Sequence, residues 1–358
     1  MTNPNELPHV AVMIITYNAQ QYLGDLFVSL AKTDYPQDKL HVVVLDNASG
    51  DGTAQTIRAS YPKVHVITSL ENTGFAKGNN IAAAFAQAWN PKYLVLLNHD
   101  TEVGPLWLVN LVRTADSDST IGIAQSLLLL HPQKNLINSL GNEIHFLGFG
   151  YSRGYREPYR AIEPPSYQAT EIPYASGAAM LLRNEVYKKI GLFDERFFMY
   201  HEDLDLGWRA RLWGYRIVLA PSSVVYHKYL FSKSITKYYW MERNRFITLL
   251  QNYHILTMVL VAPFLLCMEL GLLFQSLRKG WWREKLRVYQ YFLKLENWHA
   301  ILSARKEIQR NRVISDREAT RLFTGRIWYQ EIHSPLLTYI ANPFFNTVWW
   351  ILRKMIWW

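Results

Sequence analysis

Short runs of consecutive apolar residues alternate with segments of helical spacing along the first two thirds of the chain. Residues 9–16 are almost entirely apolar, which is typical of a strand buried on both faces of a sheet. Residues 19–32 follow with apolar positions at helical spacing, and a second apolar run covers residues 41–45. Strands that alternate with helices predict a parallel sheet. The same pattern predicts further strands at residues 64–68, 93–97, from 121, from 176, 215–219 and 223–226.

Polar turns follow several of these strands, and the carboxyl ends of parallel strands form the edge of a sheet where ligands bind. The strand at 41–45 runs into Asp46, Asn47 and a polar turn that lacks both the G-x-G-x-x-G and the G-x-x-x-x-G-K patterns. A dinucleotide or ATP site of those kinds is therefore not indicated. Two interpretations of Asp46 stay open, because its carboxylate suits either a nucleotide's base or ribose, or the cap of the next helix.

A second polar turn, Asn98-His99-Asp100, follows the strand predicted at 93–97. A carboxylate placed there suits Mg²⁺ or Mn²⁺, which prefer few protein oxygens together with phosphate oxygens. His99 is either a further ligand or a turn histidine without a special role, and His227, at the end of another predicted strand, is either structural or a Mn²⁺ ligand. Lys77 opens an alanine-rich helix and either contacts a phosphate or is solvated.

Residues 200–211, read as Y-H-E-D-L-D-L-G-W-R-A-R, predict the start of a helix with three carboxylates in its first turn. The helix dipole favours negative charge there. Asp205 has Arg209 four residues on, so an ion pair is expected, and Glu202 is free to cap the helix or to pair with a basic neighbour. Asp203 has no basic residue at those spacings, which leaves its carboxylate to face a cleft, as a general base must.

The C-terminal third has a different composition from the rest. The net charge of the chain is +9, and residues 231–358 carry 19 Lys and Arg against 8 Asp and Glu. Cys267 is the only cysteine, so neither a disulfide framework nor a cysteine metal site is expected. We expect the protein in a reducing cytoplasm. Basic residues interleaved with tryptophans and apolar runs suit an anionic membrane surface, not nucleic acid. Arg243 and Arg245 either bind phosphates or, as we prefer, are solvated or lipid-facing charges.

Residues 255–274 form an apolar run with one charge, Glu269, and a central Pro263. The run is long enough to span a bilayer. A single span would place residues 275–334 outside, although that segment carries 13 Lys and Arg against 6 Asp and Glu, which opposes the positive-inside rule. We therefore expect a broken helix that lies in, or dips into, the inner leaflet, in preference to a true span.

Five segments together resemble the family 2 glycosyltransferases of the GT-A type, over about residues 8–230. They are I-I-T-Y-N (14–18), V-L-D-N-A-S-G-D-G-T (44–53), N-T-G-F-A-K-G-N-N (72–80), L-L-N-H-D (96–100) and H-E-D-L-D-L (201–206). The bacterial rhamnosyltransferase-like branch is the most similar. The resemblance implies an α/β fold with a mostly parallel central sheet over residues 1–230. A basic, aromatic-rich helical region that associates with the membrane is expected over residues 231–358.

The resemblance also implies roles for individual residues. It makes Asp203 the catalytic base, Asp100 the last carboxylate of a D-x-D metal motif, and His227 the residue that completes a Mn²⁺ or Mg²⁺ site. Asn98 departs from the motif, whose first position is an aspartate. The implied donor nucleotide-binding residues are Thr16, Asn18, Asp46, Asn47, Gly74, Lys77 and Asn98. The weaker acceptor or phosphate-binding candidates are Glu202, Arg209, Arg243 and Arg245.

The function expected from these residues is inverting, metal-dependent transfer of a sugar from a nucleoside diphosphate sugar to an acceptor hydroxyl. The donor is dTDP-rhamnose-like or a UDP-hexose, and the acceptor is a lipid-linked saccharide or polysaccharide of the cell envelope. The enzyme is expected at the cytoplasmic face of the cell membrane, in an oligomeric state that the sequence leaves open. The alternative is a catalytically inactive membrane-bound scaffold that binds nucleotide sugars, which Asn98 favours and the presence of Asp100 and Asp203 opposes.

Overall fold

The predicted apolar runs form one mixed sheet in the computed structural model, which describes residues 7–160, 169–229, 236–328 and 335–358. β1 (Val10–Thr16) is fully buried and lies between β2 (Leu40–Asp46) and β4 (Tyr93–Leu97), parallel to both. β3 (His65–Thr68) continues the parallel half of the sheet beside β2. β11 (Ala179–Arg183) then runs antiparallel between β4 and β6 (Ile121–Leu130). The expected α/β fold is confirmed, with a sheet that is mixed beyond β4.

Three further strands extend this sheet beyond β6. β12 (Arg216–His227) pairs in parallel with β6 and carries β5 (Thr101–Val103) and β10 (Thr170–Glu171) as antiparallel neighbours. The prediction of two separate strands at 215–219 and 223–226 is wrong. β12 is one strand with a shift in register between Ala220 and Val224, because Pro221 cannot donate a ladder hydrogen bond and the pairing with β6 resumes after it.

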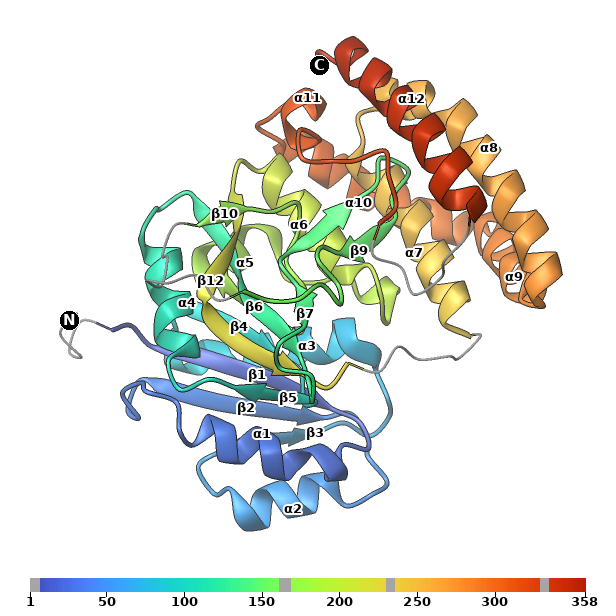
Figure 1. Ribbon diagram of the computed structural model, residues 1–358. Helices are drawn as coiled ribbons and strands as arrows, with labels where there is room; N and C mark the ends of the chain where they lie inside the picture. The colour runs from blue at the N-terminus through green and yellow to red at the C-terminus, as the bar shows by residue number, and fades with distance from the viewer. Residues whose placement is uncertain (1–6, 161–168, 230–235, 329–334) are drawn as a thin grey trace. The chain divides into compact units, whose positions relative to one another are not determined.

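Helices cover the sheet as the β-α-β order predicts. α3 (Gly74–Ala86) packs against β1 and β2, and α4 (Trp107–Asp116) packs against β6 and β12 (Figure 1). The other elements of this part of the chain are α1 (Leu23–Leu30), α2 (Thr53–Ser60), α5 (Asn184–Ile190), β7 (Ile137–Ser139), β8 (Asn142–Ile144) and β9 (Gly150–Ser152). The carboxyl ends of β1, β2 and β4 lie at one edge of the sheet, where the predicted polar turns follow β2 and β4.

The chain divides into two compact units that are not continuous in sequence. The first comprises Met1–Asn142, Ser152–Met199 and Tyr215–Tyr229, and the second comprises Glu143–Tyr151, Tyr200–Gly214 and Leu230–Trp358. The sheet belongs to the first unit, whereas α6 (Glu202–Leu212), which carries the predicted base, belongs to the second. The predicted domain boundary at residue 230 lies outside the described residues.

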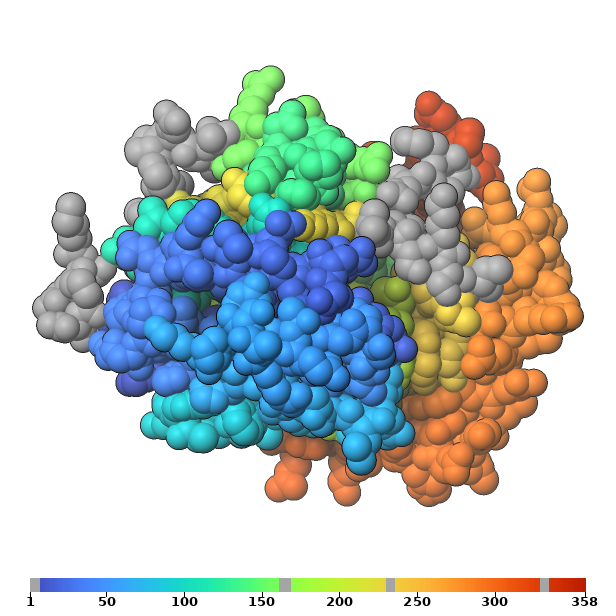
Figure 2. All heavy atoms as spheres, turned by 90° about the horizontal axis from the view of Figure 1, so that it is seen from below, coloured from blue at the N-terminus to red at the C-terminus, as the bar shows by residue number. Residues whose placement is uncertain are grey.

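The second unit is mainly helical, as predicted for the C-terminal region, and also contains most of the paired strands β8 and β9. α7 (Thr236–Asn252) packs against α6, α9 (Trp282–Leu293) and α10 (Leu295–Asn311). α8 (Ile255–Lys279) packs against α9, and α12 (Asn342–Met355) and the short α11 (Asp316–Ala319) complete the unit. Side chains of the orange segment, which includes α8 and α9, are exposed in Figure 2.

α8 differs from the expected broken helix. It continues without interruption through Pro263, so the prediction of two halves is wrong. The proline removes one backbone hydrogen bond from the helix. Because α8 also packs against α9, the chain remains helical on both sides of Pro263. Among the described residues, α8 alone is long and apolar enough to cross a membrane by length and composition.

Candidate functional site

Asp46 ends β2 with its side chain buried and fixed by two hydroxyl groups. Thr16 Oγ1, at the end of the neighbouring β1, donates to Asp46 Oδ1 over 2.8 Å, and Ser49 Oγ donates to the same oxygen. The backbone N–H of Ser49 donates to Asp46 Oδ2 over 3.2 Å. The capping interpretation is wrong, because α2 begins after Gly52 and takes no side-chain cap. The carboxylate is therefore held in one orientation at the carboxyl edge of the sheet.

Asn47 joins this edge to the start of α3. Its Oδ1 accepts from the backbone N–H of Thr73 over 2.8 Å, and its Nδ2 donates to the carbonyl of Gly74 over 3.0 Å. Gly74 has φ +81°, and a Cβ there would lie 2.5 Å from Phe198 atoms, so only glycine fits. Lys77 is exposed in the first turn of the helix that Asn47 and Gly74 position.

Asn18 shapes the turn on the other side of Asp46. Its backbone is left-handed, with φ 50°, and its Oδ1 accepts from the backbone N–H of Gly50 over 2.9 Å. The backbone N–H of Asn18 donates to Ser49 Oγ, the hydroxyl that also holds Asp46. The turns after β1 and β2 are thus bonded to one another around Asp46. Ser49 was not predicted from the sequence, because a serine in a polar turn is common.

Asp100 and His227 are brought together by the pairing of β5 with β12, which sets Thr101 opposite His227. Asp100 Oδ1 lies 3.3 Å from His227 Nε2. Within the described residues this buried oxygen makes no hydrogen bond. Burial alone would raise the pKa of Asp100, but His227 and His99 outweigh burial and the pKa is lowered, so the carboxylate is ionised near neutral pH.

The other ring nitrogen of His227 fixes the direction in which the imidazole points. Nδ1 lies 2.9 Å from Oδ1 of Asn138 and donates to it, so the lone pair of Nε2 in the neutral imidazole lies on the side of Asp100. Asn98 Nδ2 lies 3.5 Å from this Nε2, too far for a strong hydrogen bond. Asn138 lies 89 positions before His227 in the sequence, and its role in orienting the His227 ring was not predicted.

An ionised carboxylate and an imidazole lone pair that face one another fit a divalent cation. Both are ordinary ligands of Mn²⁺, and Mg²⁺ shares the preference for carboxylate oxygens. Within the described ranges, no group of three or more His, Cys, Asp and Glu side chains is placed to hold a metal. His99 Nδ1 donates to the carbonyl of Ile15 over 2.9 Å, which favours its structural interpretation.

The start of α6 carries the predicted acidic first turn. Asp205 is wholly buried, bonds to Arg209 Nε over 2.6 Å and accepts from Asn252 Nδ2 over 2.9 Å, so the predicted ion pair is confirmed. Asp203 is half-buried, and its Oδ1 accepts from the backbone N–H of Leu204 over 2.8 Å. The helical spacing thus separates a structural carboxylate from one that remains partly accessible.

The turn before α6 is strained, and side chains of the second unit hold it. Tyr200 and His201 both have left-handed backbones, with φ 68° and 69°. Asn244 Nδ2 donates to the carbonyl of Tyr200 over 2.7 Å, and a ring nitrogen of His201 lies 3.2 Å from the carbonyl of Gly148. Asn244 is a positioning residue for this turn that the sequence did not reveal.

Glu202 is buried beside Asp203, and one of its oxygens has no hydrogen-bond partner in the described part of the chain. Burial, and then the charge of Asp203, raise the pKa of Glu202 to about 8. Glu202 is therefore protonated near neutral pH.

The two arginines of α7 are not solvated charges. Arg245 is wholly buried and pairs with Glu242 and Glu269, each over 3.0 Å. Arg243 is also buried, and its guanidinium donates to Asn244 Oδ1 over 2.7 Å. The preferred interpretation as solvated or lipid-facing charge is wrong for both residues. Phosphate binding by them stays a prediction.

Comparison with known proteins places this geometry in a family. The family model described as "Glycosyltransferase like family 2" matches residues 8–246. N-acetylglucosaminyl-diphospho-decaprenol L-rhamnosyltransferase of Mycobacterium tuberculosis is 28% identical over 235 residues, which cover 60% of this chain and 75% of that protein. dTDP-rhamnosyl transferase RfbF of Shigella flexneri is 21% identical over 262 residues, or 68% of this chain and 81% of the relative.

Solved structures share the fold. S. aureus TarS 1-349 in complex with UDP-GlcNAc superimposes with a TM-score of 0.51 at 18% identity, over 98% of this chain and 93% of TarS 1-349. GalNAc-T7 with UDP, GalNAc and Mn²⁺ gives a TM-score of 0.54 at 18% identity, over 68% of this chain but only 48% of GalNAc-T7. Because the family match covers well over half of the sequence and these neighbours share its sheet, the chain belongs to the family 2 glycosyltransferases, with a GT-A fold.

Proposed function

We propose that the protein transfers a sugar, with inversion, from a nucleoside diphosphate sugar to a hydroxyl group of a lipid-linked or polysaccharide acceptor of the cell envelope. One relative is named for a decaprenol-diphosphate-linked acceptor and another for dTDP-rhamnose. A dTDP-rhamnose-like donor is therefore preferred here, with a UDP-hexose as the second candidate. The observation that carries the proposal is the buried Asp100 Oδ1, which makes no hydrogen bond among the described residues and lies 3.3 Å from His227 Nε2.

The residues at the carboxyl edge of the sheet suit a nucleotide. The Asp46 carboxylate, oriented by Thr16 and Ser49, is an acceptor for a base N–H or a ribose hydroxyl. Asn18 and Asn47 hold the loops that surround it. Lys77, Asn98 and the backbone at Gly74 are the proposed contacts to the remaining donor groups.

Asp100 and His227 would hold Mn²⁺ or Mg²⁺, and a divalent ion neutralises charge on a departing diphosphate when bound. Asn138 keeps the His227 ring in the orientation that binding requires. Asn98 is an amide where the family motif has a carboxylate, so this site has one negative charge fewer. We infer a weaker metal site that relies more on phosphate oxygens of the donor.

Asp203 is the proposed base. The acceptor oxygen attacks the anomeric carbon while its proton passes to the Asp203 carboxylate. The bond from that carbon to the diphosphate oxygen breaks, and the electron pair leaves with the nucleoside diphosphate. A single displacement inverts the anomeric centre and needs no covalent enzyme intermediate. Because Glu202 is neutral near neutral pH, it places no second negative charge beside this base.

The membrane is the proposed site of action, at its cytoplasmic face. Glu269 lies ten residues before the end of α8, about 15 Å along the helix axis. It pairs with Arg245 of α7 and with Lys285 of α9, and Tyr289 donates to it over 2.8 Å. A transverse α8 would draw these charges toward the bilayer centre, which is costly. We therefore favour α8 in the plane of the interface over a span.

The test is donor turnover by the full chain with Mn²⁺ across a panel of nucleotide sugars. We expect slow hydrolysis of one donor, and rapid transfer of its sugar when a polyprenyl-diphosphate saccharide is added. A chelator should suppress both reactions. Tight binding of a nucleotide sugar without hydrolysis or transfer under any of these conditions would instead support the inactive scaffold.

A further inference from the structure

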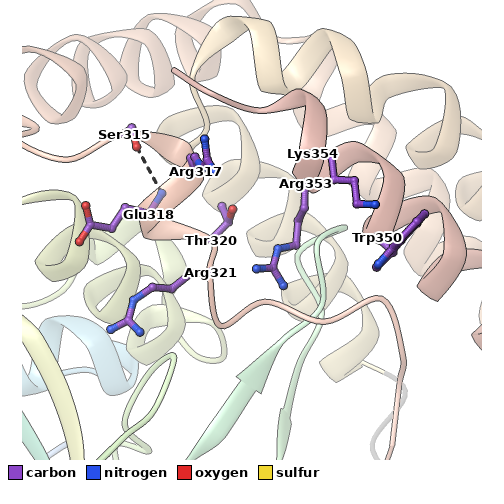
Figure 3. A pocket seen from close by; sticks show the side chains of 8 residues that line it. All are labelled: Ser315, Arg317, Glu318, Thr320, Arg321, Trp350, Arg353 and Lys354. Carbon is purple, nitrogen blue, oxygen red and sulfur yellow. Dashed lines mark hydrogen bonds between the residues drawn. The ribbon is translucent and has the colours of Figure 1, made fainter.

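A basic pocket of about 690 Å³ opens in the second unit, between α12 and the segment that holds α11 (Figure 3). Arg317 and Arg321 line it from the segment of α11, and Arg353 and Lys354 line it from α12. All four side chains are exposed. Glu318 is the one carboxylate among the lining residues, so positive charge is in clear excess. A concave surface with several arginines suits a phosphate group, whose oxygens accept their hydrogen bonds.

An aromatic side chain closes the pocket on the side of α12. Trp350 is 60% exposed, and Lys354 Nζ lies 3.3 Å from the centre of its indole ring. The lysine is thus held against the ring by a cation–π interaction. A tryptophan with a neighbouring lysine and arginine is typical of the headgroup level of a membrane, where the ring is half apolar and half wet.

α12, the helix that carries Trp350, lies beside α8, and both helices expose apolar side chains. Trp358 Nε1 donates to Thr257 Oγ1 over 2.9 Å, and the rings of Phe264 and Phe344 lie 6.4 Å apart, so the two helices run side by side and antiparallel (Figure 1). Both expose large apolar side chains. These are Leu266, Leu270, Phe274 and Leu277 on α8, and Phe344, Ile351 and Met355 on α12. We call this set the α8–α12 apolar face.

We propose that the pocket binds the phosphate headgroup of an anionic membrane phospholipid, while the α8–α12 apolar face contacts the acyl chains. A nucleotide or free phosphate would satisfy the arginines but leave the apolar face in water. A second copy of the chain would bring like charges together. An amphiphile with a negative headgroup matches both surfaces at once. This inference rests on the proposed membrane location but not on the sugar transfer.

Vesicle binding by the full chain tests the assignment. Binding is measured with phosphatidylcholine vesicles and with vesicles that also contain phosphatidylglycerol. The pocket variant is Arg317→Gln with Arg353→Gln, and the matched control is Lys306→Gln with Arg310→Gln, two exposed residues of α10. Both variants lose the same charge. The pocket variant should bind the anionic vesicles about 30-fold more weakly, and the control should lose several-fold less.

A second pair of measurements separates headgroup from acyl contact. Leu270→Gln with Phe274→Gln should weaken binding to both kinds of vesicle, because it removes apolar contact. The pocket variant should leave binding to pure phosphatidylcholine unchanged. Donor hydrolysis in solution should be unaffected in every variant. If neither the wild type nor any variant hydrolysed a donor, the proposed function would be contradicted, but the proposed lipid site would not.

Two results would overturn the lipid assignment. Equal losses in the pocket and control variants would mean that the whole basic surface attracts the membrane. Complete displacement from anionic vesicles by millimolar inorganic diphosphate, without the same effect from chloride at equal ionic strength, would mean that the pocket takes a soluble phosphate.

Discussion

The Asp100 carboxylate and the His227 imidazole face one another in a buried position. The ring donates through Nδ1 to Asn138, so in the neutral imidazole Nε2 and the nearby Asp100 Oδ1 are both acceptors. Two acceptors 3.3 Å apart repel unless a cation or a proton lies between them. A divalent cation bound between them, as proposed, would remove this repulsion.

Removal of either ligand should weaken Mn²⁺-dependent nucleotide binding and abolish transfer. We expect this of Asp100→Asn and of His227→Ala, with an unchanged fold by circular dichroism. His99→Ala is the matched control, since His99 lies in the same turn and donates to a backbone carbonyl. Calorimetric titration with Mn²⁺ and nucleotide measures the effect. Equal metal affinity in wild type and both ligand variants would remove the assignment.

The two aspartates of α6 should differ in what their loss affects. Asp203→Asn should keep donor affinity nearly unchanged and lower turnover by roughly 100-fold or more, the scale for loss of a general base. Asp205→Asn should instead cost stability, about 3 kcal/mol, because buried Arg209 loses its charged partner. Steady-state kinetics and urea unfolding of both variants separate the roles. If the effects were exchanged, Asp205 would be the base.

Glu202 should make stability depend on pH. Its pKa is about 8 in the folded protein and near its ordinary 4.5 when unfolded, so the folded state holds the proton more tightly. Stability is then greatest below the unfolded value and falls as pH rises toward about 8. Glu202→Gln should flatten this decline between pH 4.5 and about pH 8 in urea unfolding experiments. A decline of the same size in the variant would assign it to other groups.

Single residues were predictable from sequence where their partners are local. The Asp205–Arg209 pair follows from helical spacing alone, and Asp46 and Asp100 from their places after strands. Asn138 and Asn244 were not predictable, because each acts on a residue far along the chain through a fold that spacing does not encode. The burial of Arg245 was missed for the same reason.

The type of each helix or strand was predicted well, but the continuity of two elements that contain a proline was predicted wrongly. The strand at β4 has the predicted limits, and the sheet forms as expected. A break was predicted at Pro263, and two separate strands were predicted on either side of residue 221, but β12 and α8 continue. Pairing with β6 resumes after the first proline, and packing against α9 stabilises the helix beyond the second. Tertiary contacts thus outweigh the loss of one backbone hydrogen bond.

The contact of α8 with its neighbours depends on a buried ion cluster. Burial alone would raise the pKa of Glu242, but Arg245 and Lys285 outweigh it and hold the pKa at about 2. Glu269 joins the same two cations. Glu269→Gln should therefore destabilise the protein by about 3 kcal/mol, since buried cations lose a counter-charge.

An exposed pair in the same unit serves as the control for this change. Glu296 and Lys294 are 3.9 Å apart with most of both side chains in water. Glu296→Gln should change stability by less than about 1 kcal/mol. Guanidinium unfolding followed by tryptophan fluorescence compares the two variants. A similar small effect of Glu269→Gln would show that the cluster is not needed to hold α8.

For the whole molecule, the topology of the C-terminal unit decides where the enzyme meets its acceptor. The ion pairs of Glu269 with Arg245 and Lys285 connect the middle of α8 to α7 and α9. The excess of basic residues within residues 275–334 opposes export of that segment. Both features favour an α8 that lies in the inner leaflet with both flanks in the cytoplasm. Ser276 is buried, so Gln275 and Ser303, which are exposed, are the positions for labelling.

Cysteines at these two positions, each in a Cys267→Ser background, should resist an impermeant thiol reagent on intact cells. They should react once the cells are opened, which shows that the sites are accessible from the cytoplasm. A cysteine at Ser29, exposed to an intermediate degree on α1 of the first unit, is the reference, because the first unit is proposed to lie in the cytoplasm. Labelling of Gln275→Cys and Ser303→Cys from outside, with the reference protected, would establish a spanning α8. In that case the charges paired with Glu269 would have to separate from it, and the variant Glu269→Gln should then lose little stability.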